Sequence, residues 1–234
     1  MMLAWVGALF IGLSLGLLGS GGSILTVPVL VYLFGQDEKM AIASSLAIVG
    51  TIALAGSFGY WRKHLVDWKT IVLFGLPSMI ASFVGAQMAS FLSGIVQLLL
   101  FAIIMFFAAF SMLRGSAMQS QATNSKHTST VNSMLSGVGV GLMTGIIGIG
   151  GGFLIVPALV LFAGLGMRNA IGTSLFIIAL NAYTGFIKYL QILSINNQQL
   201  DWQIIISVSL IGIVGTLIGN YLCHKIPQQQ LKKG

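Results

Sequence analysis

Acidic side chains are scarce in this 234-residue sequence, which contains 4 Asp and Glu residues against 11 Lys and Arg residues. The four are Asp37, Glu38, Asp67 and Asp201, and all of them lie at or outside the ends of apolar segments. No carboxylate is therefore available inside an apolar segment to act as the usual proton or sodium relay of a membrane pump. If the chain carries a solute across a membrane, that solute either moves down its own gradient or takes protons with it, and the sequence leaves both alternatives open.

Cysteine and catalytic motifs are also lacking. The single cysteine, Cys223, excludes an intrachain disulfide and a cysteine metal cluster. The three histidines, His64, His127 and His224, are scattered near loops, and there is no H-E-x-x-H motif and no nucleophile beside a base. We therefore expect no enzymatic activity, no metal site and no cofactor.

Charged residues make up only 6% of the chain, hydrophobic residues make up 56%, and the mean hydropathy is +0.98. Soluble domains carry about 25% charged residues, so this composition predicts an integral membrane protein. Long apolar runs favour membrane helices over the short alternating strands of a barrel. The net charge of +7 lies in loops, where it marks the cytoplasmic side rather than a nucleic-acid site. We expect an all-α, multi-pass protein of the cell (plasma) membrane whose partner is the lipid bilayer, with no nucleic-acid partner.

The chain contains two copies of one segment, residues 19–46 and 148–175, and Gly21 to Pro28 align with Gly150 to Pro157 at an offset of 129. Further along, Asp67 aligns with Asp201 at an offset of 134. Apolar segments are predicted at 3–34, 41–60, 70–92, 97–113, 134–165, 169–190 and 202–223. The predicted organisation is a first repeat over 1–113, a polar linker over 114–133, and a second repeat over 134–234.

The second repeat lacks a counterpart of segment 97–113, because residue 97 maps to 231 and the sequence ends at Gly234. We expect truncation of a fourth segment in this repeat. A homodimer that covers the exposed groove is the alternative.

The first segment of each repeat has an unusual length. Each holds about 32 residues, or about 48 Å as one helix, against a hydrocarbon core of about 30 Å. Consecutive glycines interrupt both segments, so each is either a broken helix that crosses or a re-entrant hairpin. Full crossings would split the 11 Lys and Arg residues six to five between the two sides, whereas hairpins place nine on one side and only Lys39 and Lys188 on the other. The positive-inside rule favours hairpins, which make the halves inverted repeats.

The repeated pattern G-x-G-G-[SG]-[IF]-L-x-V-P-x-L-V, followed by A-I-[AG]-[ST]-S-L, resembles the sulfite exporter TauE/SafE family of membrane proteins. The resemblance covers essentially the whole chain. It implies an exporter of small inorganic or organic anions, above all sulfur-containing oxyanions such as sulfite, thiosulfate or organosulfonates. It also implies a fourth membrane segment in the second half. A non-transporting membrane scaffold or assembly subunit is the alternative function.

The glycine breaks are candidate anion sites. A break at the membrane midplane exposes backbone N–H groups at the start of the following half-helix, and such helix N-termini attract anions. Close packing of helices is the competing explanation for the glycines. Pro28 and Pro157 fit either the first turn of a half-helix or a local kink. The candidate residues at the breaks are Gly21, Gly22, Ser23, Gly150, Gly151 and Gly152.

Hydroxyl and amide side chains complete the candidate site. Ser44, Ser45, Thr173 and Ser174 open segments two and six at matched positions, and we expect them to converge near the two breaks and replace the hydration shell of an oxyanion. Caps and backbone-bonded hydroxyls are the alternative. Asn181 lies deep in segment six, where it either bonds a neighbouring helix or faces the substrate path.

Overall fold

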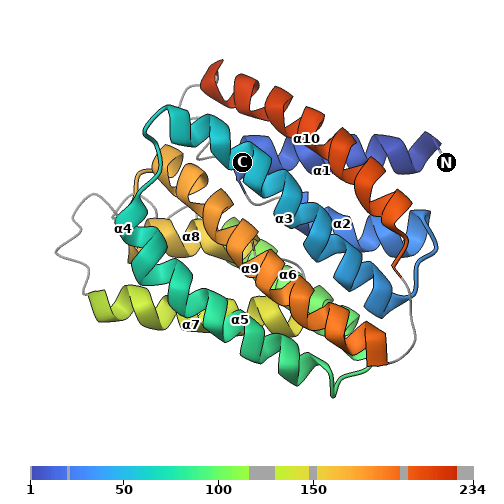
Figure 1. Ribbon diagram of the computed structural model, residues 1–234. Coiled ribbons are helices and arrows are strands. Elements are labelled where there is room, and N and C mark those ends of the chain that lie inside the picture. The colour runs from blue at the N-terminus through green and yellow to red at the C-terminus, as the bar shows by residue number, and fades with distance from the viewer. Residues whose placement is uncertain (1, 20–21, 116–129, 148–151, 196–199, 226–234) are drawn as a thin grey trace.

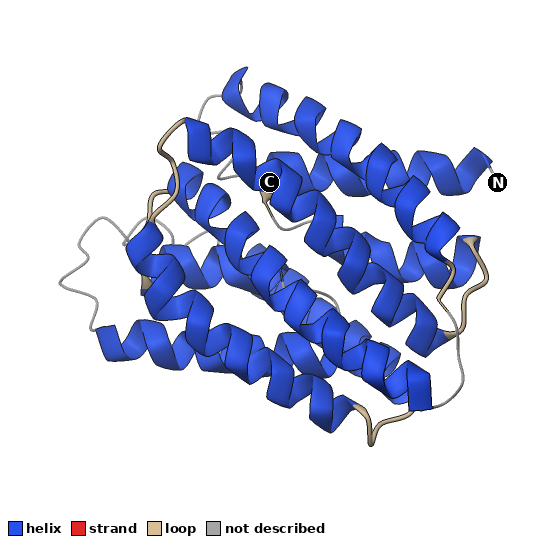
Figure 2. Ribbon diagram, viewed as in Figure 1, coloured by secondary structure: helices blue, strands red, loops and turns tan. Residues whose placement is uncertain are grey.

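The chain folds into a bundle of helices in a computed structural model that describes residues 2–19, 22–115, 130–147, 152–195 and 200–225 (Figure 1). These residues contain helices and loops but no strand (Figure 2), which confirms the predicted all-α class. The helices are α1 (Met2–Leu18), α2 (Gly22–Pro28), η1 (Val29–Leu33), α3 (Glu38–Arg62), α4 (Trp68–Thr70), η2 (Ile71–Gly75), α5 (Leu76–Ala89), α6 (Gly94–Gly115), α7 (Thr130–Ile147), α8 (Gly152–Phe162), α9 (Met167–Ile195) and α10 (Trp202–Lys225).

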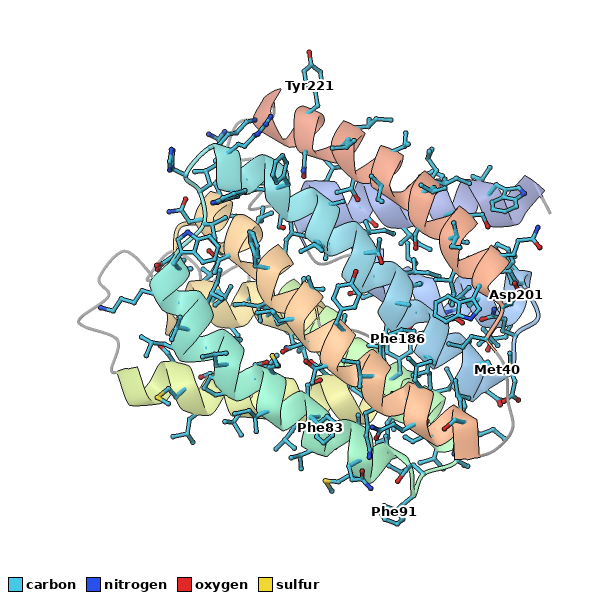
Figure 3. All side chains as sticks on the ribbon, in the orientation of Figure 1. Met40, Phe83, Phe91, Phe186, Asp201 and Tyr221 are labelled. Carbon is cyan, nitrogen blue, oxygen red and sulfur yellow. The ribbon has the colours of Figure 1, made fainter. Side chains whose placement is uncertain are left out.

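Four described segments are long and apolar enough to cross a membrane: Glu38–Arg62, Trp68–Ala89, Met167–Ser194 and Trp202–Tyr221. The first and third are the more deeply buried, so α3 and α9 form the centre of the bundle. Large apolar and aromatic side chains such as Phe91 and Tyr221 point away from the bundle (Figure 3). Such a surface is suited to lipid rather than water.

Two prolines coincide with irregular helix. Pro28 is the last residue of α2, and the π-helical segment η1 follows it directly. Pro77 is the second residue of α5, which follows the π-helical segment η2. Proline has no N–H to donate, so the hydrogen-bond ladder changes register locally. Pro28 and Pro157 both lie inside helices, so the first-turn interpretation is wrong, and irregular helix follows Pro28.

The central helices α3 and α9 run in opposite directions (Figure 1). A Cβ on Gly172, near the start of α9, would lie against Tyr60, near the end of α3. In the middle of the pair, Thr51 and Tyr183 share a hydrogen bond of 3.1 Å between their hydroxyl oxygens. α3 and α9 occupy equivalent positions in the two sequence repeats, and they cross in opposite directions with Thr51 near the middle of their contact.

Each outer helix packs mainly against a helix of the other half. α1 of the first repeat packs against α10 of the second, and α7 of the second packs against α5 of the first. A Cβ on Gly12 would overlap the carbonyl of Gly212, and a Cβ on Gly141 would overlap the carbonyl of Ser78. These two contacts are equivalent under the offsets of 129 and 134, so the sequence repeat is also a repeat of packing. Small residues allow this close approach of membrane helices.

The glycine-broken segment of the first half is a hairpin. Gly22 of α2 lies against Ile11 and Leu15 of α1, whereas Gly7 near the start of α1 lies against Val29 and Leu33 of η1. α1 and the α2–η1 arm are therefore antiparallel, and the chain leaves the hairpin on the side where it entered. Gly19 adopts the left-handed conformation, with φ of 71°, at the end of the first arm.

The directions of the other helices fit one scheme. We call the end of the bundle at which α3 begins end A and the end at which α3 finishes end B. α1, α3 and α10 run toward end B, and α5, α7 and α9 run toward end A, as their paired contacts require. α7 and α9 both start at end B, so α8 returns between them and the second half also contains a hairpin. Among described loops and helix ends, Arg62, Lys63, Lys69 and Arg168 lie at end B, and Lys39 and Lys188 lie toward end A.

Candidate functional site

The predicted glycine site is only partly within the described residues. Gly21, Gly150 and Gly151 lie outside them. Gly22 is buried, and a Cβ there would overlap the carbonyl of Ile11, so Gly22 is needed for the close packing of α1 and α2. Ser23 is fully buried in the first turn of α2, and Gly152 is the buried first residue of α8. The α2 and α8 arms contact each other, so the two hairpins meet within the bundle.

The hydroxyls at the start of α9 bond to backbone groups. Ser174 donates to the carbonyl of Ile171 at 2.8 Å and approaches the carbonyl of Gly19 at 3.4 Å. Thr173 accepts a hydrogen bond of 3.0 Å from the Asp67 backbone N–H. The structure therefore brings Ser174 to the first glycine break, as predicted, but Thr173 holds the loop after α3.

The first break does not lie at the middle of the bundle. A Cβ on Gly19 would contact Ile171, which is only four residues after the start of α9 at Met167. At 1.5 Å per residue this places Gly19 about 6 Å from the end of α9. The α1 arm therefore extends nearly as far as end B.

The hydroxyls at the start of α3 lie toward the opposite end. Ser45 donates to the carbonyl of Ile42 at 2.7 Å, while the fully buried Ser44 Oγ has no partner among the described residues. In the antiparallel register of α3 and α9, Ser174 lies level with about residue 57, some 12 residues from Ser45. That separation is about 18 Å along the helix. The prediction that all four hydroxyls converge is wrong, because antiparallel helices place their N-terminal turns at opposite ends.

Asn181 bonds a neighbouring helix at the centre of the bundle. Its Nδ2 donates to Ser78 Oγ of α5 at 2.6 Å, and its Oδ1 has no partner among the described residues. One turn further along α5, the Ser82 Oγ is also buried without a partner. Of the two alternatives for Asn181, the hydrogen bond to a neighbouring helix is observed. The other alternative, that Asn181 faces the substrate path, stays a prediction, and the unpartnered oxygen is compatible with it.

A second polar pair lies two turns further along α9. Gln97 of α6 donates from Nε2 to the Tyr189 hydroxyl at 2.7 Å and to the Ile146 carbonyl at 2.9 Å. Its Oε1 is buried and has no partner among the described residues. Asn181 and Tyr189 are eight residues apart, which places them on one face of α9. We call Ser78, Ser82, Gln97, Asn181 and Tyr189 the polar seam; all five are less than 2% exposed.

Two residues of the polar seam have apolar equivalents in the other repeat. Asn181 corresponds to Ile52, and Ser78 corresponds to Gly212, whose missing side chain leaves space that Ile52 fills. Ser82 corresponds to Thr216, which donates to the Gly12 carbonyl at 2.8 Å and so has a partner that Ser82 lacks. Tyr189 corresponds to Tyr60, whose hydroxyl approaches the Gly16 carbonyl at 3.4 Å. The Asn181–Ser78 pair and the unpartnered Ser82 hydroxyl are therefore the features that the equivalent place lacks, and the polar seam runs from the bundle centre toward end A.

The polar seam offers neutral hydrogen-bonding groups in an apolar surrounding. A buried hydroxyl or amide without a partner costs about 1–3 kcal/mol, so these atoms favour water or a solute beside them. Rotating the Asn181 amide by 180° exchanges its oxygen and nitrogen, so the group is able to accept from Ser78 and donate to an anion. Among described residues the polar seam contains no carboxylate that would repel an anion.

Sequence reasoning missed four of the five seam residues. The available signals were Ser78 and Ser82 at a spacing of four, and Asn181, Gly185 and Tyr189 at successive spacings of four. Both patterns mark one face of a helix. The partner helix and the unpartnered atoms emerge only from the packing of α5 on α9.

The two halves, the paired hairpins and the buried polar groups describe a membrane transporter. The sulfite exporter TauE/SafE family model matches residues 4–234, and the chain belongs to this family. It is 34% identical over 219 residues to a probable membrane transporter protein of Xylella fastidiosa, covering 92% of this chain and 82% of that protein. A probable membrane transporter protein of Bacillus subtilis, YdhB, is 28% identical, with 92% and 85% covered. A Haemophilus influenzae relative with the same description is 28% identical, with 98% and 90% covered. No solved structure matches.

These similarities make the chain a multi-pass membrane transporter and not an enzyme. Its environment is the lipid bilayer, and its cargo is a small molecule.

Proposed function

We propose that the protein exports small anions, most of all sulfur-containing oxyanions such as sulfite, thiosulfate or organosulfonates, and that the polar seam forms part of the path. The observation that carries the proposal is the group of unpartnered, fully buried atoms in the polar seam: Ser82 Oγ, Gln97 Oε1 and Asn181 Oδ1. The Ser82 hydroxyl is able to donate to an anion directly, and the two amides are able to do so after a 180° turn. Polar groups inside a membrane bundle commonly mark a solute pathway.

The predicted break residues supply further donors to this path. Backbone N–H groups at the start of α8, at Gly152, and at the neighbouring Gly150 and Gly151 are proposed to bind the anion together with Ser44. The first break, with Gly21, Gly22, Ser23 and Ser174, is proposed to bind it at end B. Neutral donors hold an anion weakly enough for it to leave again, unlike a buried cation.

The two halves are proposed to be inverted repeats in the membrane. The antiparallel contact of α3 with α9 supports this arrangement, and so does the excess of Lys and Arg at end B. End B is then cytoplasmic, and the polar seam opens the outer half of the path. A homodimer remains a proposal that no described contact addresses.

Anion-dependent stabilisation of the purified protein tests the proposal. A ligand that binds only the folded state at 100 times its dissociation constant adds about 2.7 kcal/mol to stability. We expect stabilisation and proteoliposome flux for at least one member of a panel of sulfite, thiosulfate, sulfonate, sulfate and carboxylate. A scaffold or assembly subunit would show neither response with any member.

Ser82 and Thr216 provide a matched pair for the path. Ser82→Ala removes a hydroxyl without a protein partner, so apparent anion affinity should fall by about 0.5–1.5 kcal/mol with little change in stability. Thr216→Val removes the hydrogen bond to Gly12 in the equivalent place of the other half, so stability should fall and affinity should stay. Equal effects of both variants on affinity would remove the polar seam from the path.

A further inference from the structure

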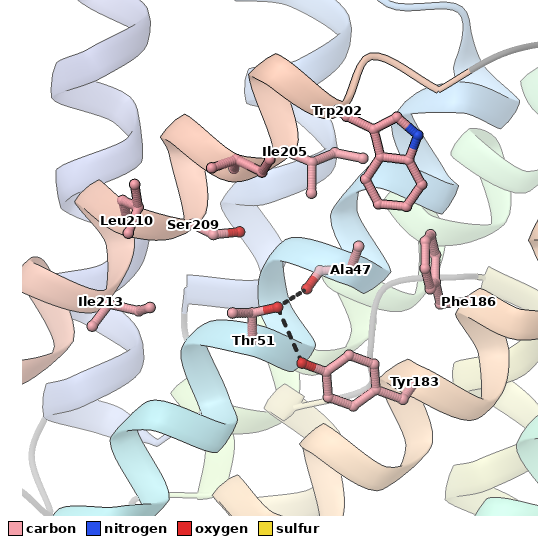
Figure 4. A pocket seen from close by; sticks show the side chains of 10 residues that line it. Ala47, Thr51, Tyr183, Phe186, Trp202, Ile205, Ser209, Leu210 and Ile213 are labelled. Carbon is pink, nitrogen blue, oxygen red and sulfur yellow. Dashed lines mark hydrogen bonds between the residues drawn. The ribbon is translucent and has the colours of Figure 1, made fainter.

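A pocket of about 300 Å³ lies between α3, α9 and α10, apart from the polar seam (Figure 4). It extends along α10 from Trp202 to Ile213, a length of about 16 Å at 1.5 Å per residue. Ala47 of α3 and Phe186 of α9 form part of the opposite wall. Its volume is at the lower end of the range for small-molecule sites in proteins.

The pocket wall carries three hydroxyls and otherwise apolar side chains. Thr51 donates to the Ala47 carbonyl at 2.8 Å and shares the bond of 3.1 Å with Tyr183, so both of these hydroxyls are engaged. Ser209 points into the pocket (Figure 4), is 6% exposed, and its Oγ has no partner among the described residues. The lining contains no charged side chain, which disfavours an ionic ligand.

The pocket has its entrance on the lipid side of the bundle. Ile206 and Leu210 of α10 line it and are 57% and 60% exposed, so they face the acyl chains of the bilayer. A ligand therefore arrives from the membrane and is already partitioned into hydrocarbon.

The equivalent place in the other half has different lining residues. Ala47 corresponds to Phe176, whose ring packs on Trp68 with centroids 5.4 Å apart. Ser209 corresponds to Gly75, and Thr51 corresponds to Leu180, so the hydroxyls are missing there as well. The pocket therefore combines the small side chain of Ala47 with hydroxyl groups at Thr51 and Ser209 that the other half lacks at the equivalent positions.

We propose that this pocket binds a neutral amphiphile from the bilayer, with its chain along α10 and its hydroxyl or carbonyl oxygen paired with Ser209. The chain replaces the van der Waals contacts that Phe176 provides in the other half. The polar group of the ligand satisfies the buried Ser209 hydroxyl, which gains more from a partner here than it would in water.

Photolabelling of the full-length protein in nanodiscs tests the proposal, with an octanol that carries a diazirine on its chain as the probe. We expect adducts on the buried residues Thr51 and Ser209, and excess octanol should suppress them. Excess octane should protect about fivefold less well, since it lacks the single hydrogen bond. Ala47→Phe should abolish the adducts, while Phe176→Ala, the matched change in the other half, should leave them in place.

Ser209→Ala is a second test, which does not depend on whether Ala47→Phe folds. This variant should retain labelling and lose the advantage of octanol over octane. Labelling confined to lipid-facing residues outside the pocket, such as Leu217 and Val72, would overturn the proposal. In the protein without substitutions, equal suppression of the adducts by octane and by octanol would also overturn the proposal. Suppression by phospholipid acyl chains alone would do the same.

Discussion

Asn181 of α9 donates a hydrogen bond of 2.6 Å to Ser78 of α5, whereas the equivalent positions of the other half hold Ile52 and Gly212. One half therefore has an amide and a hydroxyl where the other has an aliphatic side chain against a glycine. This difference separates the polar seam from the packing that both halves share.

Asn181→Ile makes the second half resemble the first at this position. We expect the melting temperature to fall by a few degrees, because the variant removes an unpartnered buried oxygen but also leaves the buried Ser78 hydroxyl without its partner. Anion flux should fall at least about tenfold, since one hydrogen-bonding position in a narrow path contributes on the order of 1 kcal/mol or more. A variant that transports normally would show that Asn181 only joins α9 to α5. Ile52→Leu is the matched control and should leave flux unchanged.

The shared packing depends on glycines with no room for a side chain. Gly141→Ala places a Cβ on the Ser78 carbonyl, so we expect a loss of about 1–3 kcal/mol, visible as a lower melting temperature. Gly139 lies on the same helix, and a Cβ there meets nothing within 4 Å. Gly139→Ala should therefore be neutral or stabilising by up to about 1 kcal/mol. Equal melting temperatures for the two variants would contradict the close contact of α7 with α5.

Cysteine labelling tests the orientation of the halves. In a background with Cys223→Ser, a cysteine at Lys63 or Gly164 should react with a membrane-impermeant reagent only from the cytoplasm. A cysteine at Gln36 should react only from the outside, because Gln36 follows the first hairpin at end A. Labelling of Gln36 and Lys63 from one side would refute the proposed inverted repeats.

Neighbouring serines of α3 distinguish free hydroxyls from bonded ones. Ser44→Ala removes a hydroxyl without a described partner, so apparent anion affinity should weaken by about 0.5–1.5 kcal/mol. The Ser45 hydroxyl already donates to the Ile42 carbonyl, so Ser45→Ala should have the smaller effect on affinity. If neither variant changes anion affinity, the two serine hydroxyls do not bind the anion, and the proposed site at the second glycine break consists of backbone groups alone.

Much of the fold is predictable from this sequence because the membrane allows few architectures. Hydropathy locates α3, α5, α9 and α10 to within a few residues. The two repeat offsets relate the contact of Gly12 with Gly212 to the contact of Gly141 with Ser78. The charge split favoured hairpins, and the antiparallel contact of Gly22 with Ile11 agrees for the first half.

The site is less predictable, because depth and partner choice depend on tertiary packing. Matched sequence positions suggested that Ser45 and Ser174 converge, but equivalent residues of antiparallel helices lie at opposite ends. Anion binding was the favoured role of Gly22 and close packing the alternative; the structure shows the packing contact, and binding at Gly22 stays a proposal. Gln97 was overlooked because its partner Tyr189 is 92 residues away.

Flux of labelled sulfite out of proteoliposomes measures the central claim most directly. The protein should give saturable flux that excess thiosulfate or sulfonate inhibits, and Asn181→Ile should reduce the flux at least about tenfold without loss of folded protein. If neither sulfite nor any other anion of the panel crosses faster than in protein-free vesicles, the anion export proposed for this transporter is contradicted.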